Sequence, residues 1–412
     1  MENQNVIDTL IERGYLAQST DLEMLKEIFA KPGVRFYIGF DPTADSLHVG
    51  HFIQMMVMAH LQRAGHVPVA LLGGGTGMIG DPSGRTDMRK MLTPEVIEHN
   101  VKQFAKQMEI LLDFSEGKGM IVNNADWLLD LKYIDFLREV GPHFTVNKML
   151  AADAYKRRLD EGLTFFEFNY MTIQAYDFYR LYTDHNVKVE LGGNDQWSNI
   201  LAGTELIRRK TGNHDALGLT TNLLVKSNGE KMGKTASGAL WLNEEKTSPF
   251  DFYQYWRNID DADVINCMKL LTFLPMDKIA EYEKLEGQEI NEAKKVLAFE
   301  VTKTVHGEEK AKHAEQQALD IFSGEGRTDD MPSLEVNSSE LAQGLPLLQV
   351  MTDAGLTKSN SEARRMVQQN AVRINDEVLN DVNYELSDKD LVNNEIIIRK
   401  GKKNHFRVLL VD

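Results

Sequence analysis

Residues 34–51 read Val34-Arg-Phe-Tyr-Ile-Gly-Phe40, then Asp41-Pro-Thr-Ala-Asp-Ser-Leu47, then His48-Val-Gly-His51. The first part is rich in aromatic and β-branched residues, which predicts a buried strand. The second part is a short polar loop, and the third opens a helix that we expect over Leu47–Ala64. A strand that passes through a short loop into a helix is the building unit of a parallel sheet with helices on its faces.

The same order recurs through the first two-thirds of the chain. Val67-Pro-Val-Ala-Leu-Leu72 is a continuous apolar run, typical of a parallel strand that is buried on both faces. Thr93-Pro94 opens a helix by the cap-then-proline signal. Further strands are expected at residues 119–123, 187–191 and 219–225. This alternation predicts an α/β fold with a Rossmann-like, doubly wound parallel sheet.

The pattern changes after this region. Residues 248–322 are mainly helical and are punctuated by Pro249, Pro275 and Gly307. Residues 323–345 are rich in Ser, Gly, Pro and acidic side chains, which is typical of a linker. We therefore expect a Rossmann-like domain, a helical domain, a linker and a small C-terminal α+β domain, at residues 1–247, 248–322, 323–345 and 346–412 in that order.

The composition is that of an ordinary globular protein. Of the 412 residues, 42% are hydrophobic and 26% are charged, which excludes wholesale disorder and fibrous repeats. The single cysteine, Cys267, excludes an intrachain disulfide and any multi-cysteine metal site. No leader peptide and no run of roughly 18 apolar residues is visible, so we expect no membrane segment and a cytoplasmic location.

The charge is unevenly distributed. The net charge of −16 argues against nonspecific nucleic-acid binding by the chain as a whole. Residues 345–412 hold ten basic and ten acidic side chains, so they carry none of this excess. A polyanionic partner would have to meet a local basic patch.

Two histidines stand three positions apart at the start of the first expected helix. His48 and His51 would share one helix face, next to free backbone N–H groups and the positive end of the helix dipole. Such a place can hold phosphate, and Gly50 would let a nucleotide approach the backbone. The alternative is that both histidines cap the helix or pack in the core.

A second feature is the helix expected over Thr164–Tyr182, which begins with a capping-box pattern and is apolar on most sides. Tyr170, Gln174 and Asp177 form one polar stripe on it. A buried carboxylate requires hydrogen-bond partners. The stripe therefore indicates either partners within the protein or a small polar substrate.

Three loops after strands carry glycine and charge. One is the glycine-rich loop after residue 72, one is Glu190-Leu-Gly-Gly-Asn-Asp195-Gln196-Trp197, and one is Lys231-Met-Gly-Lys234-Thr235. Ligands bind at the carboxyl ends of parallel strands, so the loops indicate a site. Two lysines around a glycine suit a clamp on phosphates, although a solvated basic loop is the alternative.

Together these segments resemble the class I aminoacyl-tRNA synthetases. His48-Val-Gly-His51 resembles the HIGH signature of that class, and Lys231-Met-Gly-Lys-Thr235 resembles its KMSKS signature. Further matches point to the bacterial-type tyrosyl-tRNA synthetases. They are Tyr37-Ile-Gly-Phe-Asp-Pro-Thr43, Ile79-Gly-Asp-Pro-Ser-Gly84, the stripe Tyr170, Gln174 and Asp177, and Gly192-Gly-Asn-Asp-Gln-Trp197.

The resemblance implies two steps. Tyrosine and MgATP form tyrosyl-adenylate, and the tyrosyl group then passes to the 3′ end of tyrosine tRNA, with no metal bound by the protein itself. It implies that the phosphates are stabilised by His48, His51, Thr43, Lys231, Lys234 and Thr235, with Arg85 and Arg89 closing over them. It implies that the nucleotide is held by Asp41, Gly50, Gly193, Asp195 and Lys234.

For the amino acid, the resemblance implies that Tyr37 and Asp177 bind the phenol hydroxyl. Asp81, Tyr170 and Gln174 would hold the α-ammonium group, and Gln196 would face the carboxylate. Glu190 stands where many relatives have glutamine, and Ile38 stands where some have a hydrogen-bonding residue. Neither receives a family role.

The C-terminal domain resembles an RNA-binding domain shared with a ribosomal small-subunit protein (the S-four-like domain). A helix at Ser361-Glu-Ala-Arg-Arg365, a strand and turn at 371–376, and a basic hairpin turn at Arg399-Lys-Gly-Lys-Lys403 carry this resemblance. Basic side chains on a turn and a neighbouring helix can contact an RNA backbone. The family also implies a homodimer, for which apolar residues of Asp126–Leu150 are interface candidates.

Three alternatives remain open at this point. A tryptophan enzyme of the same fold would not need the hydroxyl-binding pair Tyr37 and Asp177. A small-molecule nucleotidyltransferase can share the His-x-Gly-His start, but the lysine loop and the C-terminal domain argue against it. An RNA-binding protein without catalysis would not need to retain the phosphate-facing residues.

Overall fold

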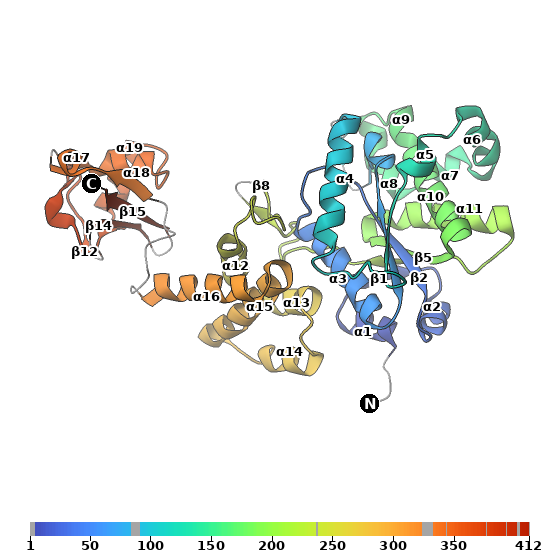
Figure 1. Ribbon diagram of the computed structural model, residues 1–412, viewed down its shortest axis with the longest axis horizontal. Helices are drawn as coiled ribbons and strands as arrows, with labels where there is room; N and C mark the ends of the chain where they lie inside the picture. The colour runs from blue at the N-terminus through green and yellow to red at the C-terminus, as the bar shows by residue number, and fades with distance from the viewer. Residues whose placement is uncertain are drawn as a thin grey trace. The chain divides into compact units, whose positions relative to one another are not determined.

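A six-stranded sheet forms the centre of the larger of two units, which span Met1–Ala318 and Leu319–Asp412. The computed structural model describes residues 5–83, 91–235, 238–323, 333–342, 344–375, 377–392, 394–401 and 404–411 (Figure 1). Across the sheet the strands are β1 (Leu16–Ser19), β6 (Leu217–Thr221), β5 (Val187–Gly193), β2 (Arg35–Phe40), β3 (Val67–Leu72) and β4 (Met120–Asn123).

All neighbouring strands of this sheet are parallel except β1, which pairs antiparallel with β6. Strands β2, β3 and β4 run outward in one direction, while β5 and β6 lie on the other side of β2. This reversal makes the β2–β5 boundary a topological switch point, where parallel α/β sheets bind ligands. The predicted doubly wound parallel sheet is confirmed.

The two faces of the sheet belong to two cores, because successive side chains of a strand point to opposite faces. Phe36, Ile38 and Phe40 of β2 join the core that contains α3 (Val49–Arg63) and α4 (Pro94–Met108). Tyr37 joins the other core, with α10 (Tyr170–His185) and α11 (Trp197–Thr211). The edge helices of the unit are α1 (Val6–Glu12), α2 (Leu22–Phe29), α5 (Ala125–Leu128), α6 (Tyr133–Glu139), α7 (Val146–Leu150) and α8 (Asp153–Glu161).

The single helix predicted over 164–182 is wrong, because the structure has α9 (Phe165–Phe168) and then α10. The capping box is present, with Thr164 Oγ1 accepting from the Glu167 backbone N–H at 3.2 Å. The Tyr155 hydroxyl donates to the Phe168 carbonyl at 2.8 Å and accepts from the Met171 N–H at 3.2 Å. A side chain inserted into the helical hydrogen-bond ladder interrupts it. Tyr155 lies outside the segment 164–182 whose pattern predicted one helix, so that pattern did not reveal the break.

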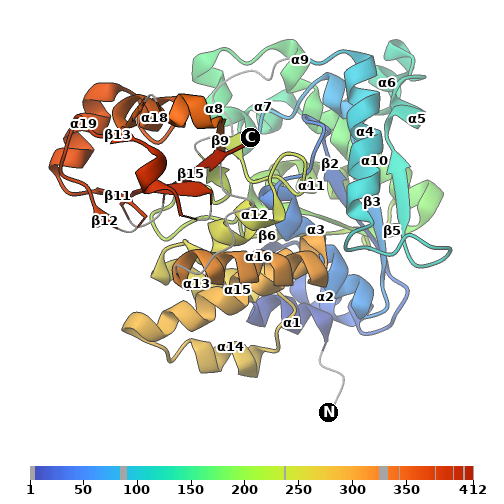
Figure 2. The same cartoon turned by 60° about the vertical axis from the view of Figure 1, so that its left-hand side comes forward.

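Residues 248–318 do not form a separate unit, although a helical domain at 248–322 was expected. The helices are α12 (Pro249–Arg257), α13 (Val264–Leu271), α14 (Met276–Tyr282), α15 (Ile290–His306) and α16 (Glu308–Ser323). Trp256, Cys267 and Leu297 share one core with the α3 side of the sheet. Figure 2 shows α13 to α15 grouped next to α1 and α3. The buried Arg13 adds hydrogen bonds to the carbonyls of Lys269 and Thr272 at the end of α13, at 2.9 and 2.8 Å.

The smaller unit contains a five-stranded sheet. Its order is β12 (Glu377–Val378), β11 (Val372–Ile374), β14 (Glu395–Lys400), β15 (Asn404–Leu410) and β9 (Ser333–Val336). The sheet packs with α17 (Ser338–Ala342), α18 (Leu347–Asp353) and α19 (Asn360–Gln368) around buried side chains such as Met351, Val367 and Ile398. Strands β14 and β15 form the predicted hairpin. A small β10 (Leu345–Pro346) pairs with β13 (Glu385–Leu386).

The predicted linker at 323–345 is corrected in its second part. Residues 333–336 form β9, which lies parallel to β15, and Val336 is buried in the small core. Residues 338–342 form α17, and Leu341 is also buried. Ser, Gly, Pro and acidic residues suggested a linker, but pairing with a strand some seventy positions later fixes this segment. None of the described helices is long and apolar enough to cross a membrane.

Candidate active site

One cavity of about 520 Å³ lies at the carboxyl ends of β2 and β5, at the switch point. It brings together almost every predicted site residue. Those that line it are Tyr37, Asp41, Thr43, His48, Gly50, His51, Asp81, Tyr170, Gln174, Asp177, Gly193, Asp195, Gln196, Lys231 and Lys234. Arg85, Arg89 and the side chain of Thr235 lie outside the described residues, as do Lys402 and Lys403 of the C-terminal turn.

The two histidines of the α3 start serve the helix as well as the cavity. The Nδ1 of His48 accepts from the Gly50 N–H at 2.9 Å, and the Nδ1 of His51 accepts from the His48 N–H at 3.1 Å. The rings stack with centroids 3.9 Å apart. The capping alternative is therefore correct, and it coexists with a position in the cavity. Burial, followed by the charge of Lys231, lowers the pKa of His48, so its imidazole is neutral at physiological pH.

The glycines of the site have packing reasons that the motif reading did not give. A Cβ on Gly50 would lie 2.7 Å from His48 Cε1, so this glycine makes room for the capping ring. A Cβ on Gly193 would lie 2.6 Å from Asp195 Oδ1. A Cβ on Gly73 would lie 2.2 Å from Asp41 Oδ1. Side chains of the site thus pack directly on the backbone of the glycine loops.

Asp41 is held by two hydroxyl groups. Thr76 Oγ1 donates to Asp41 Oδ1 at 2.8 Å, and the Tyr170 hydroxyl donates to Asp41 Oδ2 at 2.9 Å. Asp41 directly follows β2, Thr76 belongs to the glycine loop after β3, and Tyr170 opens α10. The carboxylate therefore ties three elements together at one end of the cavity.

A second polar network crosses the middle of the cavity. Gln196 Nε2 donates to Asp81 Oδ2 at 2.6 Å, and Asp81 Oδ1 accepts from the Ser83 N–H at 2.8 Å. Asn199 Nδ2 contacts both Gln174 Oε1 and Gln196 Oε1, at 3.0 and 3.1 Å. The sequence analysis missed Asn199, which is buried on the first turn of α11.

Asp177 lies deep in the cavity and is fully buried among donors from α5. Asn124 Nδ2 donates to Oδ2 at 2.9 Å, and Trp127 Nε1 donates to Oδ1 at 2.7 Å. Burial raises the pKa of Asp177 to about 8, while the two N–H donors act in the opposite direction. Asn124 and Trp127 were also missed, because they lie about fifty positions before Asp177 and carry no motif.

Glu190 lines the cavity beside Tyr37. Its Oε1 accepts from Gln174 Nε2 at 2.9 Å. Burial raises the pKa of Glu190 to about 7, and burial together with the nearby Glu190 charge raises the pKa of Tyr37 well above its usual range. Glu190 therefore belongs to the polar lining, although it received no role from the sequence.

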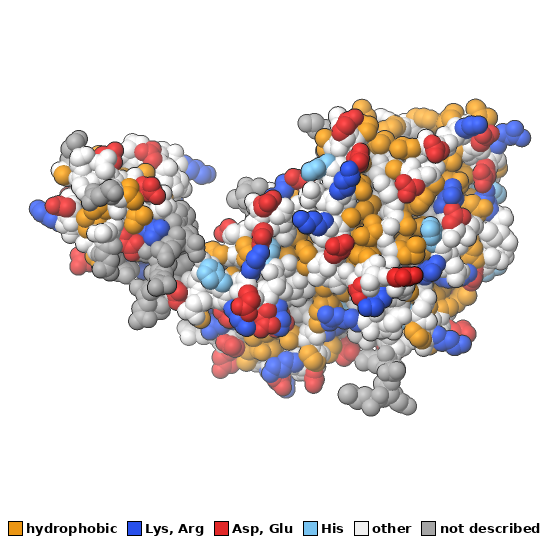
Figure 3. Space-filling model, viewed as in Figure 1, with side chains coloured by type: hydrophobic (Ala, Val, Ile, Leu, Met, Phe, Trp, Pro, Cys, Tyr) orange, Lys and Arg blue, Asp and Glu red, His pale blue; other side chains and the backbone are white. Residues whose placement is uncertain are grey.

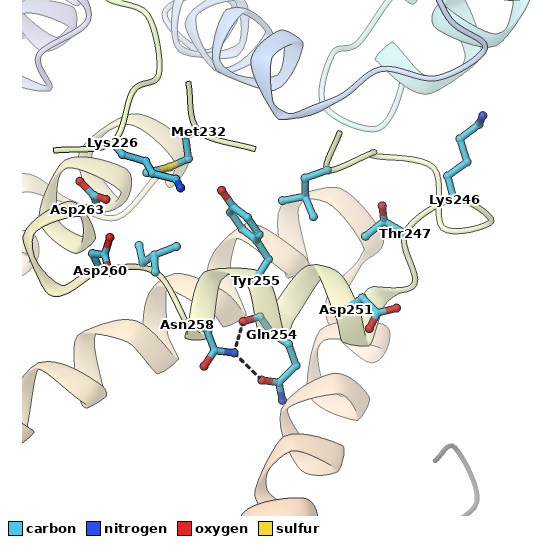
Figure 4. Close-up of a pocket in the computed structure, with 12 residues that line it drawn as sticks. Lys226, Met232, Lys246, Thr247, Asp251, Gln254, Tyr255, Asn258, Asp260 and Asp263 are labelled. Carbon is cyan, nitrogen blue, oxygen red and sulfur yellow. Dashed lines mark hydrogen bonds between the residues drawn. The ribbon is translucent and has the colours of Figure 1, made fainter. Parts of the chain in front are cut away.

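The lysine loop packs on the protein through Met232 and Gly233, whereas its lysine side chains are exposed. The buried Met232 side chain contacts Cys267 of α13, with sulfur atoms 3.3 Å apart, and the Gly233 N–H donates to the Tyr255 hydroxyl at 2.8 Å. Figure 4 shows Tyr255 of α12 pointing toward Met232 in a neighbouring hollow of about 650 Å³. Lys231 and Lys234 are exposed and face the first cavity. The loop can thus present two charges from a packed base.

Within the described ranges, no group of three or more His, Cys, Asp or Glu side chains is placed to hold a metal ion. The cavity offers two imidazole rings and two lysine side chains at one end, and buried carboxyl, amide and phenol groups at the other. Such a division suits a phosphate ester next to a small polar substrate.

Two protein families match this chain, one over most of the larger unit and one over the smaller unit. The family described as "tRNA synthetases class I (W and Y)" matches residues 30–323, and the family described as "Tyrosine--tRNA ligase SYY-like C-terminal domain" matches residues 324–408. The parallel sheet with its histidine and lysine signatures is thus the catalytic unit of a class I aminoacyl-tRNA synthetase.

The chain belongs to the tyrosine–tRNA ligase family, and it ligates tyrosine to tRNA. It is 56% identical to the tyrosine–tRNA ligase of Acetivibrio thermocellus over 407 residues, which cover 99% of this chain and 100% of the relative. It is 55% identical to that of Clostridium beijerinckii over 404 residues, which cover 98% and 99%. This similarity favours tyrosine over the tryptophan and nucleotidyltransferase alternatives.

A solved structure of a C-terminally truncated mitochondrial tyrosyl-tRNA synthetase from Aspergillus nidulans is also similar. The TM-score is 0.69 with 29% sequence identity, and the match covers 78% of this chain and 95% of that one. The fold and the family agree.

Proposed function

We propose that the cavity at the ends of β2 and β5 binds tyrosine and ATP side by side and forms tyrosyl-adenylate there. The observation that carries this proposal is that one cavity holds the buried pair Tyr37 and Asp177 together with the exposed cations Lys231 and Lys234. The first pair suits a phenol and the second suits phosphates.

Tyrosine lies with its phenol at Asp177 and its ammonium group near Asp81. Each Asp177 oxygen already accepts one N–H, which leaves a lone pair for the phenol hydroxyl. Tyr170, Gln174 and Asp81 offer oxygen atoms to the ammonium group, and Gln196 lies beside Asp81 toward the carboxylate. Phenylalanine would leave the buried Asp177 without its hydroxyl partner, which is unfavourable.

ATP arrives as its magnesium complex and lies with its phosphates at the α3 start. His48, His51, Thr43, Lys231, Lys234 and Thr235 stabilise them, and Arg85 and Arg89 join from the segment after Ser83. Asp195 and Asp41 contact the nucleotide, and Gly50 and Gly193 leave room for it. Lysine and imidazole N–H donors stabilise the charge that develops on the phosphate.

The tyrosine carboxylate oxygen attacks the α-phosphorus, and the bond from that phosphorus to the bridging oxygen breaks as pyrophosphate leaves. The carboxylate is already ionised, so no general base is needed and the site acts by positioning and charge stabilisation. In the second step a ribose hydroxyl at the tRNA 3′ end attacks the tyrosyl carbonyl, and AMP leaves. We propose that both reactions take place in the cytoplasm, where ATP and tRNA are present.

The smaller unit binds tRNA through a basic sheet face. Arg373 of β11 and Arg399 of β14 are register partners, so they lie side by side on one face of the sheet. Arg364 and Arg365 of α19 are exposed. These cations suit phosphate contacts. Helices of the segment 248–322 would contact the anticodon stem.

A homodimer completes the proposal. Large apolar side chains are exposed on short consecutive helices beyond α4, and Figure 3 shows hydrophobic surface gathered on that part of the larger unit. The most exposed are Leu129, Tyr133, Ile134, Val146 and Phe165, at 59, 58, 63, 55 and 69%. Apolar surface of this kind marks protein interfaces. Ile134→Glu should yield monomers in sedimentation, whereas Val96→Glu on α4 should leave the dimer intact, and a monomeric wild type would contradict the interface.

The decisive experiment is tyrosine-dependent ATP–pyrophosphate exchange without tRNA, run against all amino acids. Exchange with tyrosine alone is expected, and Asp177→Ala should lose the preference for tyrosine over phenylalanine. Exchange supported by tryptophan, or an unchanged preference in the variant, would overturn the assignment of this pocket.

A further inference from the structure

Glu190 and Tyr37 stand at the same level of two adjacent parallel strands. Their Cα atoms are register partners between β5 and β2, so both side chains point to the face covered by α10 and α11. Each is 1% exposed, and both line the cavity. The family resemblance implies no role for Glu190.

One oxygen atom of each side chain in this pair lacks a hydrogen-bond partner among the described residues. Glu190 Oε1 is paired with Gln174 Nε2 at 2.9 Å. Within the described part of the chain, Glu190 Oε2 and the Tyr37 hydroxyl each have no hydrogen-bond partner of adequate geometry. An unpaired carboxylate oxygen at full burial is strongly unfavourable, whereas a protonated carboxyl can itself act as a donor.

The surroundings do not supply a cation to Glu190. From α11, Gly203 approaches so closely that a Cβ there would lie 3.0 Å from Oε2. From α10 the facing groups are Gln174, Tyr170 and Asp177, and from β2 and its following loop they are Tyr37 and Asp41. Among the described residues, no lysine or arginine forms an ion pair with Glu190. Its neighbours are therefore neutral or acidic.

Three carboxyl groups share this small volume, and their partners differ. Asp41 accepts from two hydroxyls, and Asp177 accepts from two N–H groups. Among the described residues, the one hydrogen bond of good geometry to Glu190 comes from the Gln174 amide. Burial raises the pKa of both carboxyl groups, to about 8 for Asp177 and about 7 for Glu190, so the two groups compete for the proton. We assign the proton to Glu190 because the two N–H donors and the substrate hydroxyl of the proposed pocket all require Asp177 as an acceptor.

We propose that Glu190 is a positioning residue for tyrosine recognition, in which its carboxylic acid donates a hydrogen bond to the Tyr37 hydroxyl. The Tyr37 O–H is then free to point at the phenol oxygen of the substrate, and the substrate O–H points at Asp177. In this series of hydrogen bonds, the O–H groups of Glu190, Tyr37 and the substrate each donate to one acceptor. The proposal rests on the tyrosine pocket proposed above, because it needs the phenol at Tyr37 and Asp177.

A consequence separates this chain from relatives with glutamine at the same position. A glutamine N–H donates at every pH, whereas the glutamic acid donates only while it is protonated. Burial raises the pKa of Glu190 to about 7, so the donor is lost as the pH rises above neutrality. Ionisation also places a second charge beside Asp177. The KM for tyrosine should therefore rise with pH in this enzyme.

The test is tyrosine-dependent ATP–pyrophosphate exchange from about pH 6 to about pH 8.5 with wild type, Glu190→Gln and Glu190→Leu. Titration of tyrosine itself affects all variants equally, so the readout is the ratio of the wild-type KM to the Glu190→Gln KM. This ratio should rise on the order of tenfold toward the alkaline end. Glu190→Leu should raise the KM at every pH, with a smaller effect on kcat.

Glu205→Gln is the matched control, because it removes a carboxylate from α11 that is paired with Arg208 and Arg209 away from the cavity. It should follow the wild-type profile. If the KM ratio stays flat with pH, the Glu190 proposal is overturned, and this holds even if Glu190→Leu does not fold. If Asp177→Ala keeps the preference for tyrosine over phenylalanine, the pocket assignment itself fails, which is a different result.

Discussion

The indole Nε1 of Trp127 donates a hydrogen bond to Asp177 Oδ1 across 2.7 Å, and both side chains are buried. The donor comes from a helix of four residues, α5, and the acceptor lies in the middle of α10. In the tyrosine pocket proposed above, this bond would hold the carboxylate in the orientation that the phenol of the substrate requires. The selectivity of that pocket would then depend on a residue that no motif identifies.

Replacing Trp127 with Phe should raise the KM for tyrosine on the order of tenfold, because a hydrogen bond to a charged group contributes about 1.5–3 kcal/mol. The measurement is pyrophosphate exchange at varied tyrosine. Trp256→Phe is the control, since that buried indole N–H has no partner among the described residues. An unchanged KM in Trp127→Phe would show that Asn124 alone suffices.

In the proposed site, the helix-capping role of His48 and its role toward the phosphates can be separated by mutation. His48→Asn keeps a side-chain cap for α3, because asparagine is a good N-cap residue, but it removes the imidazole from the cavity. We expect near-normal thermal stability and a large loss of kcat in this variant. His48→Ala should lose the same activity and in addition about 1 kcal/mol of stability. Equal melting temperatures for the two variants would contradict the capping role.

Gly73→Ala tests the packing of the glycine loop on Asp41. The new Cβ would lie 2.2 Å from Asp41 Oδ1 and 2.6 Å from Thr76 Oγ1. Overpacking of this kind costs about 1–3 kcal/mol, and it should displace the carboxylate and reduce adenylate formation. Gly141→Ala is the control, because nothing lies within 4 Å of its Cβ position. If Gly73→Ala is as active as wild type, the loop does not position Asp41.

The site could be predicted largely because its residues sit in short local motifs at strand ends. His48, Lys231 and Asp195 each belong to a segment that is recognisable by itself, and the parallel topology brings the segments together. Asn124, Trp127 and Asn199 reach the site through hydrogen bonds to Asp177 and Gln174, which lie 25 to 53 positions away in the sequence. Such partners depend on tertiary contacts, so no local pattern indicates them.

Strands with a strong local pattern could be predicted in the same way, whereas elements that depend on distant contacts could not. The buried strands β2 and β3 are continuous apolar runs, and their positions match the expectation. The edge strand β9 is short, half polar and paired only by long-range contacts. The break between α9 and α10 depends on the Tyr155 hydroxyl. Composition and periodicity carry no information on either feature.

The position of β9 determines where the smaller unit can be removed. A cut before Leu345 would leave β9 and α17 without the sheet and core that bury them. Removal of residues 324–412 avoids this and should spare pyrophosphate exchange while strongly reducing charging of tRNA. Charging and exchange are measured on the same preparation. Normal charging by the shortened chain would contradict the RNA-binding role of the smaller unit.

Glu190 should also give the stability of the larger unit an unusual pH dependence. Its pKa in the folded chain is about 7, whereas a glutamate in an unfolded chain titrates near about 4.3. Between these values the folded state keeps the proton that the unfolded state has lost, so the free energy of unfolding falls as the pH rises through this window and then levels off. The loss is on the order of 4 kcal/mol.

Glu190→Gln removes this titration, so the variant should gain stability relative to wild type as the pH rises from about 4.5 to about 7, and the difference should be constant above that range. Urea unfolding followed by tryptophan fluorescence is suited to the measurement, because all four tryptophans lie in the larger unit. Glu205→Gln again serves as the control and should show no such gain. A stability difference that is the same at both ends of the window would mean that Glu190 is ionised in the folded protein, and the hydrogen bond that it donates to Tyr37 would then be excluded.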